Sequence, residues 1–387
     1  HSASRGRLLA GAAAAAIAAA AGATAQTAPP ERTIPPTIVT ATPIEESDGT
    51  GPVRGWQALP TRSATRTTTP IEQVPQSITV IPRTMIDDQG SVTLTDALRN
   101  ATSVAAQHPT YFNQTLNNRI RGFVAEVYRD GLPAFFDAGM GQSLVGVNRI
   151  EVLRGPSAPL FGGGYGGGLG GLINIVSAQP MPTKRYEGGF RYGPYGQINP
   201  YFDLNQAVQI APDGTQLMMR LSGEYMQGHS YLDNVWSTGY QILPSFTIAN
   251  DRTRLTVNAF FSERRANDYS GLPTMGTLNT SQFTTPRFLN PNGSNVPRTV
   301  SQRNGAAFLF EQENAGSWTF RLAGRFTASN MEQPAQYIAG PPIFGSTFLM
   351  GNAYLNQDQT QISVLPTIEG RFSPGPVQPV GLAGMDL

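Results

Sequence analysis

The 387-residue sequence contains no cysteine and only three histidines. Without cysteine the chain can form neither disulfides nor thiolate metal sites, and it has no thiol nucleophile. His1, His108 and His229 lie far apart and show none of the spacings at which histidines share a metal ion. The sequence therefore predicts no metal site built from these residue types.

Charged residues are also scarce, at 14% of the sequence. The 27 Lys and Arg residues nearly cancel the 26 Asp and Glu residues, which leaves a net charge of +1. Since nucleic-acid-binding proteins usually present a strongly basic face, this balance predicts no nucleic-acid partner. No P-loop lysine, nucleophile elbow or close pair of carboxylates stands out. We therefore expect no catalytic residues, and the protein is not expected to be an enzyme.

Apolar runs are short throughout the chain, and the most apolar one lies at the N-terminus. Arg5 and Arg7 precede a run of small and apolar residues that ends in Ala23-Thr24-Ala25. A basic start, a short apolar run and an A-x-A site are typical of a secretory signal peptide, whereas a spanning helix needs about 20 apolar residues. Residues 1–25 are therefore predicted to be a signal peptide that directs export.

Residues 26–75 are predicted to form a flexible arm. Proline, threonine and glycine dominate this stretch, and its apolar surface is too small to offset the entropy of ordering it. One exception is Thr37-Ile38-Val39-Thr40-Ala41, a run of β-favouring residues between Pro36 and Pro43. Such a segment can add as a strand to the edge of a partner's sheet, although a chance cluster would give the same pattern.

Residues 76–182 are predicted to form a small mixed α/β domain. Polar and apolar residues alternate from Gln76 to Ile81, which predicts a strand. Residues 83–88 are expected to form a helical turn, and Thr93 is placed to cap a helix over Leu94–Arg99. The other elements expected here are short strands at 119–123 and 126–129, a turn at Asp130-Gly131, and strands at 150–153 and 172–177.

A glycine-dense loop, residues 162–171, separates the last two of these strands. Its letters Gly162-x-Gly164-x-x-Gly167 match a dinucleotide-binding fingerprint. That motif requires a helix directly after it and an acidic residue about 20 positions on. Here a predicted strand follows and Glu187 stands isolated, so we expect no nucleotide site, which a nucleotide-binding assay can check. We expect instead that the loop threads close to barrel walls that tolerate little side-chain volume.

From residue 183 to 387 the hydrophobic period is two. Apolar and polar residues alternate over ten or so positions in the stretches 216–226, 253–262, 318–328 and 361–369. These runs are longer than ordinary strands and match tilted membrane-spanning strands of about 9–11 residues. We count about nine strands, the last at 380–387, and predict part of an antiparallel transmembrane β-barrel.

The connections between these strands favour a membrane barrel over a soluble β-sandwich. Short turns are predicted at residues 211–214, 249–251, 313–316 and 373–376, and long connections at 229–236, 266–302 and 331–356. Short and long connections are expected to alternate strictly, as in outer-membrane barrels with tight turns on one side and long loops on the other. A sandwich would not require all long loops at one end.

Several motifs taken together resemble the plug of TonB-dependent outer-membrane receptors, and most closely that of the ferric-siderophore receptors. The resemblance covers residues 37–387. Its motifs are Thr69-Pro70-Ile71-Glu72-Gln73-Val74-Pro75-Gln76-Ser77-Ile78, Arg119-Ile120-Arg121-Gly122-Phe123, Tyr128-Arg129-Asp130-Gly131-Leu132-Pro133, Ile150-Glu151-Val152-Leu153-Arg154-Gly155-Pro156 and Leu172-Ile173-Asn174-Ile175-Val176.

The resemblance implies an outer-membrane protein in which a plug fills a barrel of about 22 strands. Residues 37–41 then resemble the TonB box, which pairs with a strand of TonB from the inner-membrane energy-coupling complex. Arg121 and Arg154 would pair with barrel glutamates on strands beyond this sequence, which ends less than halfway round a barrel. The glycine loop is about three residues longer than the usual plug pattern. The complete protein would be a monomer in contact with outer-membrane lipid.

The resemblance also implies uptake of ferric siderophores, which bind at plug apices facing outward. These apices are expected at residues 107–117 and 134–142, with Tyr111, Phe112, Phe135 and Phe136 as ligand contacts. Iron would arrive already chelated, so no cofactor is expected. The alternatives are uptake of another large solute, such as cobalamin, haem or an oligosaccharide, and a passive barrel or adhesin without energy coupling.

Overall fold

The computed structural model describes residues 55–56, 60–106, 118–134, 143–156, 158–161, 169–267, 298–314, 317–340, 343, 347, 349–372 and 379–386. All of them belong to the compact unit Glu46–Leu387. The predicted signal peptide and the predicted TonB box lie outside the described residues, as do the glycines 162–168. None of the helices in the described ranges is both long and apolar enough to cross a membrane.

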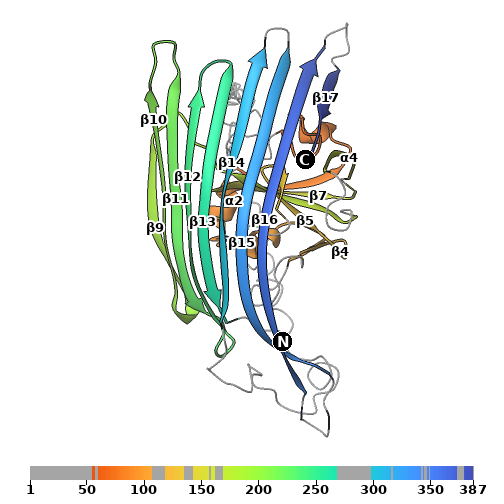
Figure 1. The fold of residues 1–387 in the computed structure, drawn as a ribbon, viewed down its shortest axis with the longest axis vertical. Coiled ribbons are helices and arrows are strands. Elements are labelled where there is room, and N and C mark those ends of the chain that lie inside the picture. The colour runs from red at the N-terminus through yellow and green to blue at the C-terminus, as the bar shows by residue number, and fades with distance from the viewer. Residues whose placement is uncertain are drawn as a thin grey trace, which may run out of the picture. The chain divides into compact units, whose positions relative to one another are not determined.

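The N-terminal part of this unit, residues 60–177, is a mixed α/β domain built on two small sheets (Figure 1). The larger sheet has the order β1-β7-β8-β5-β6, with only β5 and β8 parallel, and the smaller one has the order β2-β3-β4. The strands are β1 Ser77–Pro82, β2 Val104–Ala105, β3 Arg119–Ile120, β4 Phe123–Val124, β5 Glu126–Arg129, β6 Leu132–Pro133, β7 Val147–Arg154 and β8 Gly171–Ser177. The helices are η1 Ile71–Gln73, α2 Arg83–Asp88, α3 Leu94–Leu98 and α4 Ala158–Phe161.

Local sequence signals explain several of these elements. Thr93 caps α3 as predicted: its side chain accepts a hydrogen bond from the Asp96 amide, and the Asp96 carboxylate accepts from the Thr93 amide. The turn at Asp130-Gly131 is also confirmed, with φ angles of 54° and 78°. The single strand predicted at 119–123 is wrong. Arg121 and Gly122 adopt φ angles of 54° and 88°, so this stretch turns back as the β3–β4 hairpin.

The core of the α/β domain forms around β7, whose eight residues are all buried. Ile150 and Val152 pack on one face with Ile81, Leu98 and Ile173. On the other face Arg149 donates to the Glu151 carboxylate at 2.5 Å, and Thr61 donates to the same carboxylate at 2.6 Å. A fully buried carboxylate is tolerated when it is paired and hydrogen-bonded in this way.

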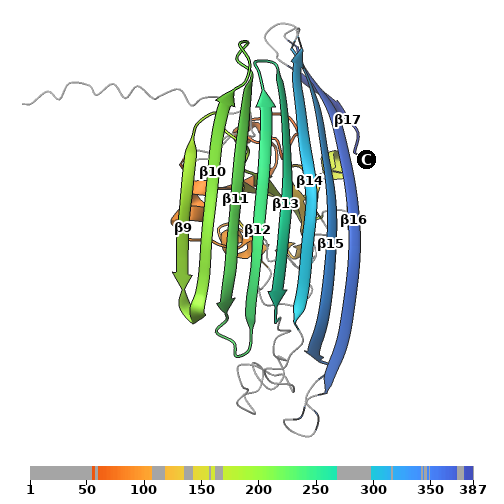
Figure 2. The ribbon, with the colours of Figure 1, turned by 60° about the vertical axis from the view of Figure 1, so that its left-hand side comes forward.

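The rest of the described chain forms a nine-stranded antiparallel sheet in which each strand pairs with the next in sequence (Figure 2). This confirms the expected fold class and strand number. The strands are β9 Arg185–Gly193, β10 Gln197–Gln209, β11 Gln216–His229, β12 Trp236–Ala249, β13 Thr253–Ala266, β14 Thr299–Asn314, β15 Trp318–Ile338, β16 Met350–Arg371 and β17 Val380–Gly384; the 3-10 turn η2 Pro194–Gly196 joins β9 to β10.

Two expectations about the connections are wrong. First, most of the predicted long connection 331–356 is strand, because β15 and β16 reach 21 and 22 residues and stay paired out to Ile338 and Met350. Second, short and long connections do not alternate strictly. η2 is a tight turn at the end of the sheet where the longer connections lie, and its positive φ angles at Tyr195 and Gly196 allow the reversal. We call that end the loop end and the opposite one the turn end.

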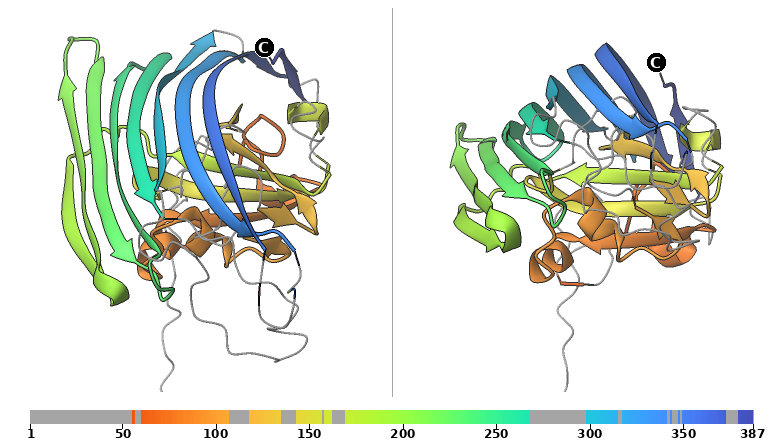
Figure 3. Two further views of the ribbon diagram at one scale, coloured as in Figure 1. Left: turned by 60° about the horizontal axis from the view of Figure 1, so that its bottom comes forward. Right: turned by 90° about the horizontal axis from the view of Figure 1, so that it is seen from below.

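Burial on the nine-stranded sheet is the reverse of that in a soluble protein. Large apolar side chains are exposed on every strand: Tyr192, Leu204, Leu221, Phe246, Val257, Phe308, Phe326, Ile362 and Val380. Polar side chains at alternate positions are buried: Asn205, Ser222, Gln241, Thr256, Arg303, Thr327 and Ser363. Figure 3 shows the sheet curving around the α/β domain, which covers the polar face. An apolar outer face over a polar inner face is the pattern of a membrane barrel and not of a sandwich.

Candidate functional site

The structure describes only two of the residues predicted for function. Tyr111 and Phe112 lie outside the described residues, as do Phe135 and Phe136 and the five residues of the predicted TonB box. The ligand contacts and the TonB box therefore stay predictions. Arg121 and Arg154 are described, and both belong to the α/β domain.

Arg154 is buried at the end of β7 and is held by neutral groups. Its guanidinium donates to the Thr102 carbonyl at 2.9 Å and to the Thr79 hydroxyl at 2.7 Å. Burial, and secondarily the positive charge of Arg121, lower the pKa of Arg154. Within the described part of the chain neither arginine forms an ion pair with a carboxylate. A buried arginine with a second positive charge nearby is costly without an anionic partner.

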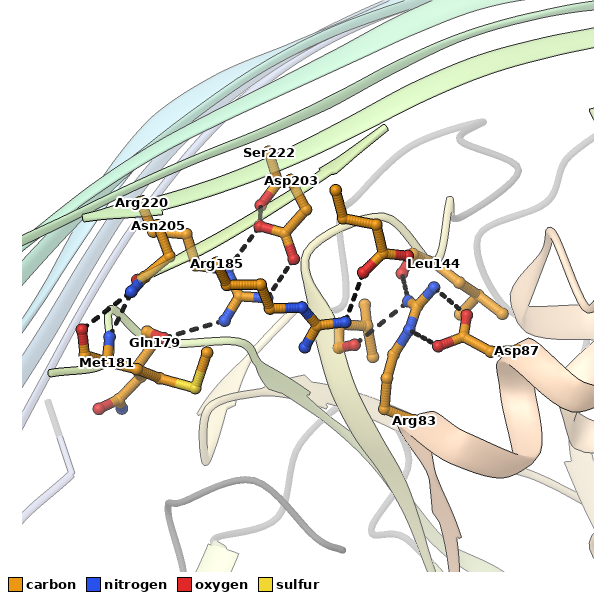
Figure 4. A network of polar contacts seen from close by, with 12 residues as sticks. Arg83, Asp87, Leu144, Gln179, Met181, Arg185, Asp203, Asn205, Arg220 and Ser222 are labelled. Carbon is orange, nitrogen blue, oxygen red and sulfur yellow. Dashed lines mark hydrogen bonds and ion pairs between the residues drawn. The ribbon is translucent and has the colours of Figure 1, made fainter. Parts of the chain in front are cut away.

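A cavity of about 400 Å³ lies between the α/β domain and the start of the sheet. Helix α2 lines one side of it, and β9, β10 and β11 line the other. Figure 4 shows the polar groups around it. Arg220 on β11 donates to both carboxylate oxygens of Asp203 on β10, at 2.8 and 2.5 Å, and to the Gln179 carbonyl at 3.0 Å. The pair therefore also holds the segment that leaves the α/β domain.

A second barrel residue, Asn205, also binds the segment that leaves the α/β domain, residues 179–183, which we call the leaving segment. Its amide nitrogen donates to the carbonyls of Met181 at 2.9 Å and Thr183 at 2.5 Å, and its oxygen accepts from the Met181 amide at 3.0 Å. Because Asn205 is 1% exposed, water competes little for these bonds. The chain from residue 179 to 183 is thus fixed to β10 and β11 before it enters β9.

On the other side of the cavity, Arg83 links α2 to the rest of the α/β domain. It donates to the Leu144 carbonyl at 2.6 Å and to both carboxylate oxygens of Asp87, at 2.9 and 2.5 Å (Figure 4). In the described ranges no hydrogen bond or ion pair joins α2 itself to the nine-stranded sheet. The two sides of the cavity are therefore held in different ways.

A further contact lies closer to the loop end. The Ser143 hydroxyl donates to the carboxylate of Glu224 on β11, and Asn199 on β10 donates to the same carboxylate at 3.0 Å. Arg191 on β9 donates to the Asn199 oxygen at 2.8 Å. This network joins Ser143, which directly follows the predicted apex 134–142, to the barrel wall.

The first described residues of the α/β domain also reach the sheet. We call residues 60–69 the entry segment. Arg62 lies 3.6 Å from the carboxylate of Glu369 on β16, and Arg321 donates a hydrogen bond to the same carboxylate at 2.8 Å. Arg66 lies 3.5 Å from the Asp386 carboxylate. The entry segment therefore contacts both the core strand β7, through Thr61, and the barrel. A pull on the chain before residue 60 would act on these contacts first.

At Gly146 the backbone of the α/β domain lies close to a side chain of the wall. The φ of Gly146 is 65°, and a Cβ there would lie 2.8 Å from Leu243 Cδ1 on β12. We expect Gly146→Ala to loosen the α/β domain by about 2 kcal/mol, from backbone strain plus the clash. Faster protease cleavage of this domain in the folded receptor would report the loosening.

The matched control is Leu243→Ala, alone and combined with Gly146→Ala. Removing the Leu243 side chain removes the clash but not the backbone strain, so the double variant should be less cleavable than the two single effects predict. Strictly additive effects would show that the two residues do not press on each other.

These contacts were not predicted from the sequence. Asp203 and Asn205 occupy alternate, inward-facing positions of β10, so the period of two assigns them to the polar face of the sheet but does not identify their partners. Their partners are backbone carbonyls of residues 179–183, which carry no side-chain signal at all. In the described ranges no group of three or more His, Asp or Glu residues could hold a metal ion.

The fold and the site together define a class of protein. A strand-rich sheet with an apolar outer face, closed on its polar face by an independently cored α/β domain, is a plugged outer-membrane barrel. The family described as "TonB-dependent Receptor Plug Domain" matches residues 70–169. Residues 70–169 are therefore a plug domain of this family, and the nine-stranded sheet that follows is part of a barrel. Proteins of this family are outer-membrane receptors and not enzymes, in agreement with the expected localisation and the expected lack of catalysis.

Curated relatives and solved structures agree with this assignment. The "Ferrichrome outer membrane transporter/phage receptor" of Escherichia coli K12 is 25% identical, over 93% of this chain and 50% of its own length. The "Ferrioxamine B receptor" of Salmonella typhimurium SL1344 is 29% identical, over 56% of this chain and 31% of its own. This chain therefore spans half of the first relative's length and less of the second's.

Among solved structures, the Escherichia coli K12 ferric-catecholate import receptor Fiu in its open form matches with a TM-score of 0.71 at 21% identity, over 84% of this chain and 51% of Fiu. The outer-membrane receptor FpvA of Pseudomonas aeruginosa PAO1, bound to pyoverdine, matches with a TM-score of 0.73 at 18% identity, over 89% of this chain and 51% of FpvA. At these identities the two matches establish the fold.

Proposed function

We propose that this chain is part of a receptor that takes up ferric siderophores across the outer membrane, with energy supplied through TonB. The observation that supports transport is a plug seated by polar contacts inside a sheet whose outer face is apolar. The relatives' names support the substrate class, since they refer to ferrichrome, ferrioxamine and pyoverdine. The cargo brings its own iron, so the protein itself needs no metal ligands.

The ligand is proposed to bind at the outward apices, residues 107–117 and 134–142. Tyr111, Phe112, Phe135 and Phe136 would offer stacking and apolar surface there. The contact between Ser143 and Glu224 supports this location, because it joins the residue that directly follows the second apex to the barrel wall. The domain boundaries that we propose are a signal peptide 1–25, an arm 26–75 whose last part, from residue 60, packs against the plug, a plug 76–182 and barrel strands from 183 onward.

The two plug arginines are proposed to meet glutamates on barrel strands that follow this sequence. The supporting observation is that Arg154 is buried with neutral partners and lies beside Arg121. A closed barrel would bring further strands to this side of the plug. The usual distance limit for an ion pair is about 4 Å. A structure of the complete receptor in which no carboxylate lies that close to either guanidinium would contradict this pairing.

The test of substrate class is growth rescue. Cells that lack other siderophore receptors and express the complete receptor would be starved of iron and given a panel of ferric siderophores. Rescue by at least one of them is expected. Parallel arms with cobalamin, haem and an oligosaccharide address the alternative solutes, and growth rescue confined to one of those arms would overturn the siderophore assignment.

We expect Tyr111→Ala combined with Phe112→Ala to weaken binding of the rescuing siderophore about tenfold or more. The reason is that each stacked aromatic contact contributes roughly 0.5–1.5 kcal/mol beyond its buried area. The measurement is equilibrium binding to the purified receptor. Tyr192→Ala is the matched control, since Tyr192 is 75% exposed on the outer face of β9 and should leave affinity unchanged. Equal affinity of the double variant and the wild type would remove these two residues from the site.

A further inference from the structure

We propose that the solute binds transiently, on its way through the receptor, in the 400 Å³ cavity between α2 and the β9–β11 wall. Helix α2 is the movable wall of this cavity, and the barrel side is its fixed wall. The inference rests on the proposed transport function and adds where the solute passes and what moves. The ligand class that fits is a hydrophilic, oxygen-rich chelate without a large net charge.

The fixed wall is defined by side-chain bonds to backbone. Asn205 holds Met181 and Thr183 through their main-chain groups, and Arg220 holds the Gln179 carbonyl. These bonds do not depend on the rest of the plug keeping its fold, because both partners lie on the barrel or on the chain entering β9. This side of the cavity should therefore stay in place while the plug rearranges.

The movable wall has weaker anchors. Helix α2 is six residues long and has a single buried side chain, Ile86. Its polar link to the neighbouring backbone runs through Arg83, which donates to Leu144 and Val147 carbonyls at 2.6 and 3.4 Å. A short helix with few buried contacts lies at the low-stability end of a domain and opens before the core does. Displacing α2 would widen the cavity without unfolding β7 and β8.

The position of the cavity suits an exit path. Arg185 begins β9 at the turn end, and Arg220 lies near the start of β11 at the same end. The contact of Ser143 with Glu224 lies farther toward the loop end. A solute that enters from the loop end would reach this cavity after passing the apex, on its way to the turn end.

The lining chemistry points to the solute class. Three arginine–carboxylate pairs face the cavity, and each contains its own counter-charge: Arg83 with Asp87, Arg185 with Glu187, and Arg220 with Asp203. Each guanidinium group offers several hydrogen-bond donors in a fixed planar arrangement, and the carboxylate paired with it neutralises its positive charge. Such a surface binds carbonyl and hydroxyl oxygens without trapping an ion. The volume is within the usual range of roughly 300–1,000 Å³ for small-molecule sites.

The test is a cross-link made after folding, which avoids any folding defect. Residues 1–387 contain no cysteine, so this part of the receptor contributes no background when paired cysteines react. One receptor carries Thr84→Cys and Tyr201→Cys, which join α2 to the fixed wall across the cavity. The matched receptor carries Met181→Cys and Tyr201→Cys, which join two points of the fixed wall. Both are linked in intact cells with a bis-thiosulfonate reagent whose bonds a reductant breaks.

Linking 84 to 201 should leave surface binding of the ferric siderophore intact and stop its accumulation, and reductant should restore it. Linking 181 to 201 should leave accumulation at the rate of the same unlinked receptor. Accumulation that continues through the 84–201 link, or an equal block by both links, overturns the proposal. If the unlinked receptors bind and accumulate no ferric siderophore, the proposed function fails instead, so the two failures are distinguishable.

Discussion

Deleting residues 37–41 is expected to reduce accumulation of the ferric siderophore to the level of cells without TonB, while binding at the cell surface stays unchanged. The proposed physical reason is that this β-competent segment adds as a strand to TonB, and main-chain hydrogen bonds across that strand pair transmit the pull. The pull would then reach the entry segment and its contacts with Glu151 and Glu369. Accumulation and binding are measured with radiolabelled ferric siderophore.

The control replaces residues 37–41 with five glycines and serines, which keeps the length of the arm. Since glycine and serine have low β propensity, this variant should fail in the same way as the deletion. A variant that replaces the same number of residues at 46–50 should transport normally. Normal accumulation after deletion of 37–41 would show that the pull, if there is one, is applied elsewhere.

Gly171→Ala is expected to destabilise the plug by on the order of 4 kcal/mol, from a strained backbone and a direct clash. Gly171 has a φ of 126°, and a Cβ there would lie 2.0 Å from the Leu153 carbonyl oxygen on the neighbouring strand β7. No flexible side chain can yield, because the obstacle is backbone. Rapid proteolysis within residues 143–177 of the membrane-embedded receptor should report the loss.

Gly155→Ala is the matched control for this substitution. Gly155 belongs to the same domain and has a φ of 103°, but a Cβ there meets nothing within 4 Å. It therefore carries the backbone strain without the clash, and its plug should be cleaved far more slowly than that of Gly171→Ala. Equal cleavage of the two variants would show that strain alone, and not the contact with β7, makes Gly171 necessary.

Gly170 and Gly171 also refine the expectation for the glycine-dense loop. We expected it to thread close to barrel walls, but its described end, Gly170 and Gly171, lies against other residues of the plug. The obstacle, however, is the plug's own backbone: a Cβ at Gly170 would lie 2.5 Å from the Ile120 carbonyl oxygen. The loop therefore ends where β8 enters the centre of its own domain. The sequence shows that glycine is needed there but not which backbone it approaches.

Elements encoded locally could be predicted from the sequence. Thr93 and Asp96 carry the α3 cap within four residues, and Asp130-Gly131 supplies its own turn geometry. The alternation of apolar and polar residues predicted a nine-stranded sheet, because period two directly reflects which side chains face lipid.

The predictions that were wrong concern structure that depends on contacts between residues distant in sequence. The sequence around Arg121 is typical of a strand, but the chain reverses at Arg121 and Gly122 so that β4 pairs with β3. Strands β15 and β16 extend beyond their predicted ends because they remain paired with each other. The bonds from Asn205 and Arg220 to carbonyls of the leaving segment carry no signal in the accepting residues. Docking of the plug is thus a tertiary property that single-sequence patterns do not contain.

The most direct test of TonB-dependent ferric-siderophore uptake compares two strains that express the complete receptor and differ only in TonB. Both are given the radiolabelled ferric siderophore that rescues growth, and cell-associated iron is followed over time. The account predicts equal initial binding in both strains and continued accumulation only where TonB is present. Equal accumulation in both strains would contradict it and identify a passive barrel.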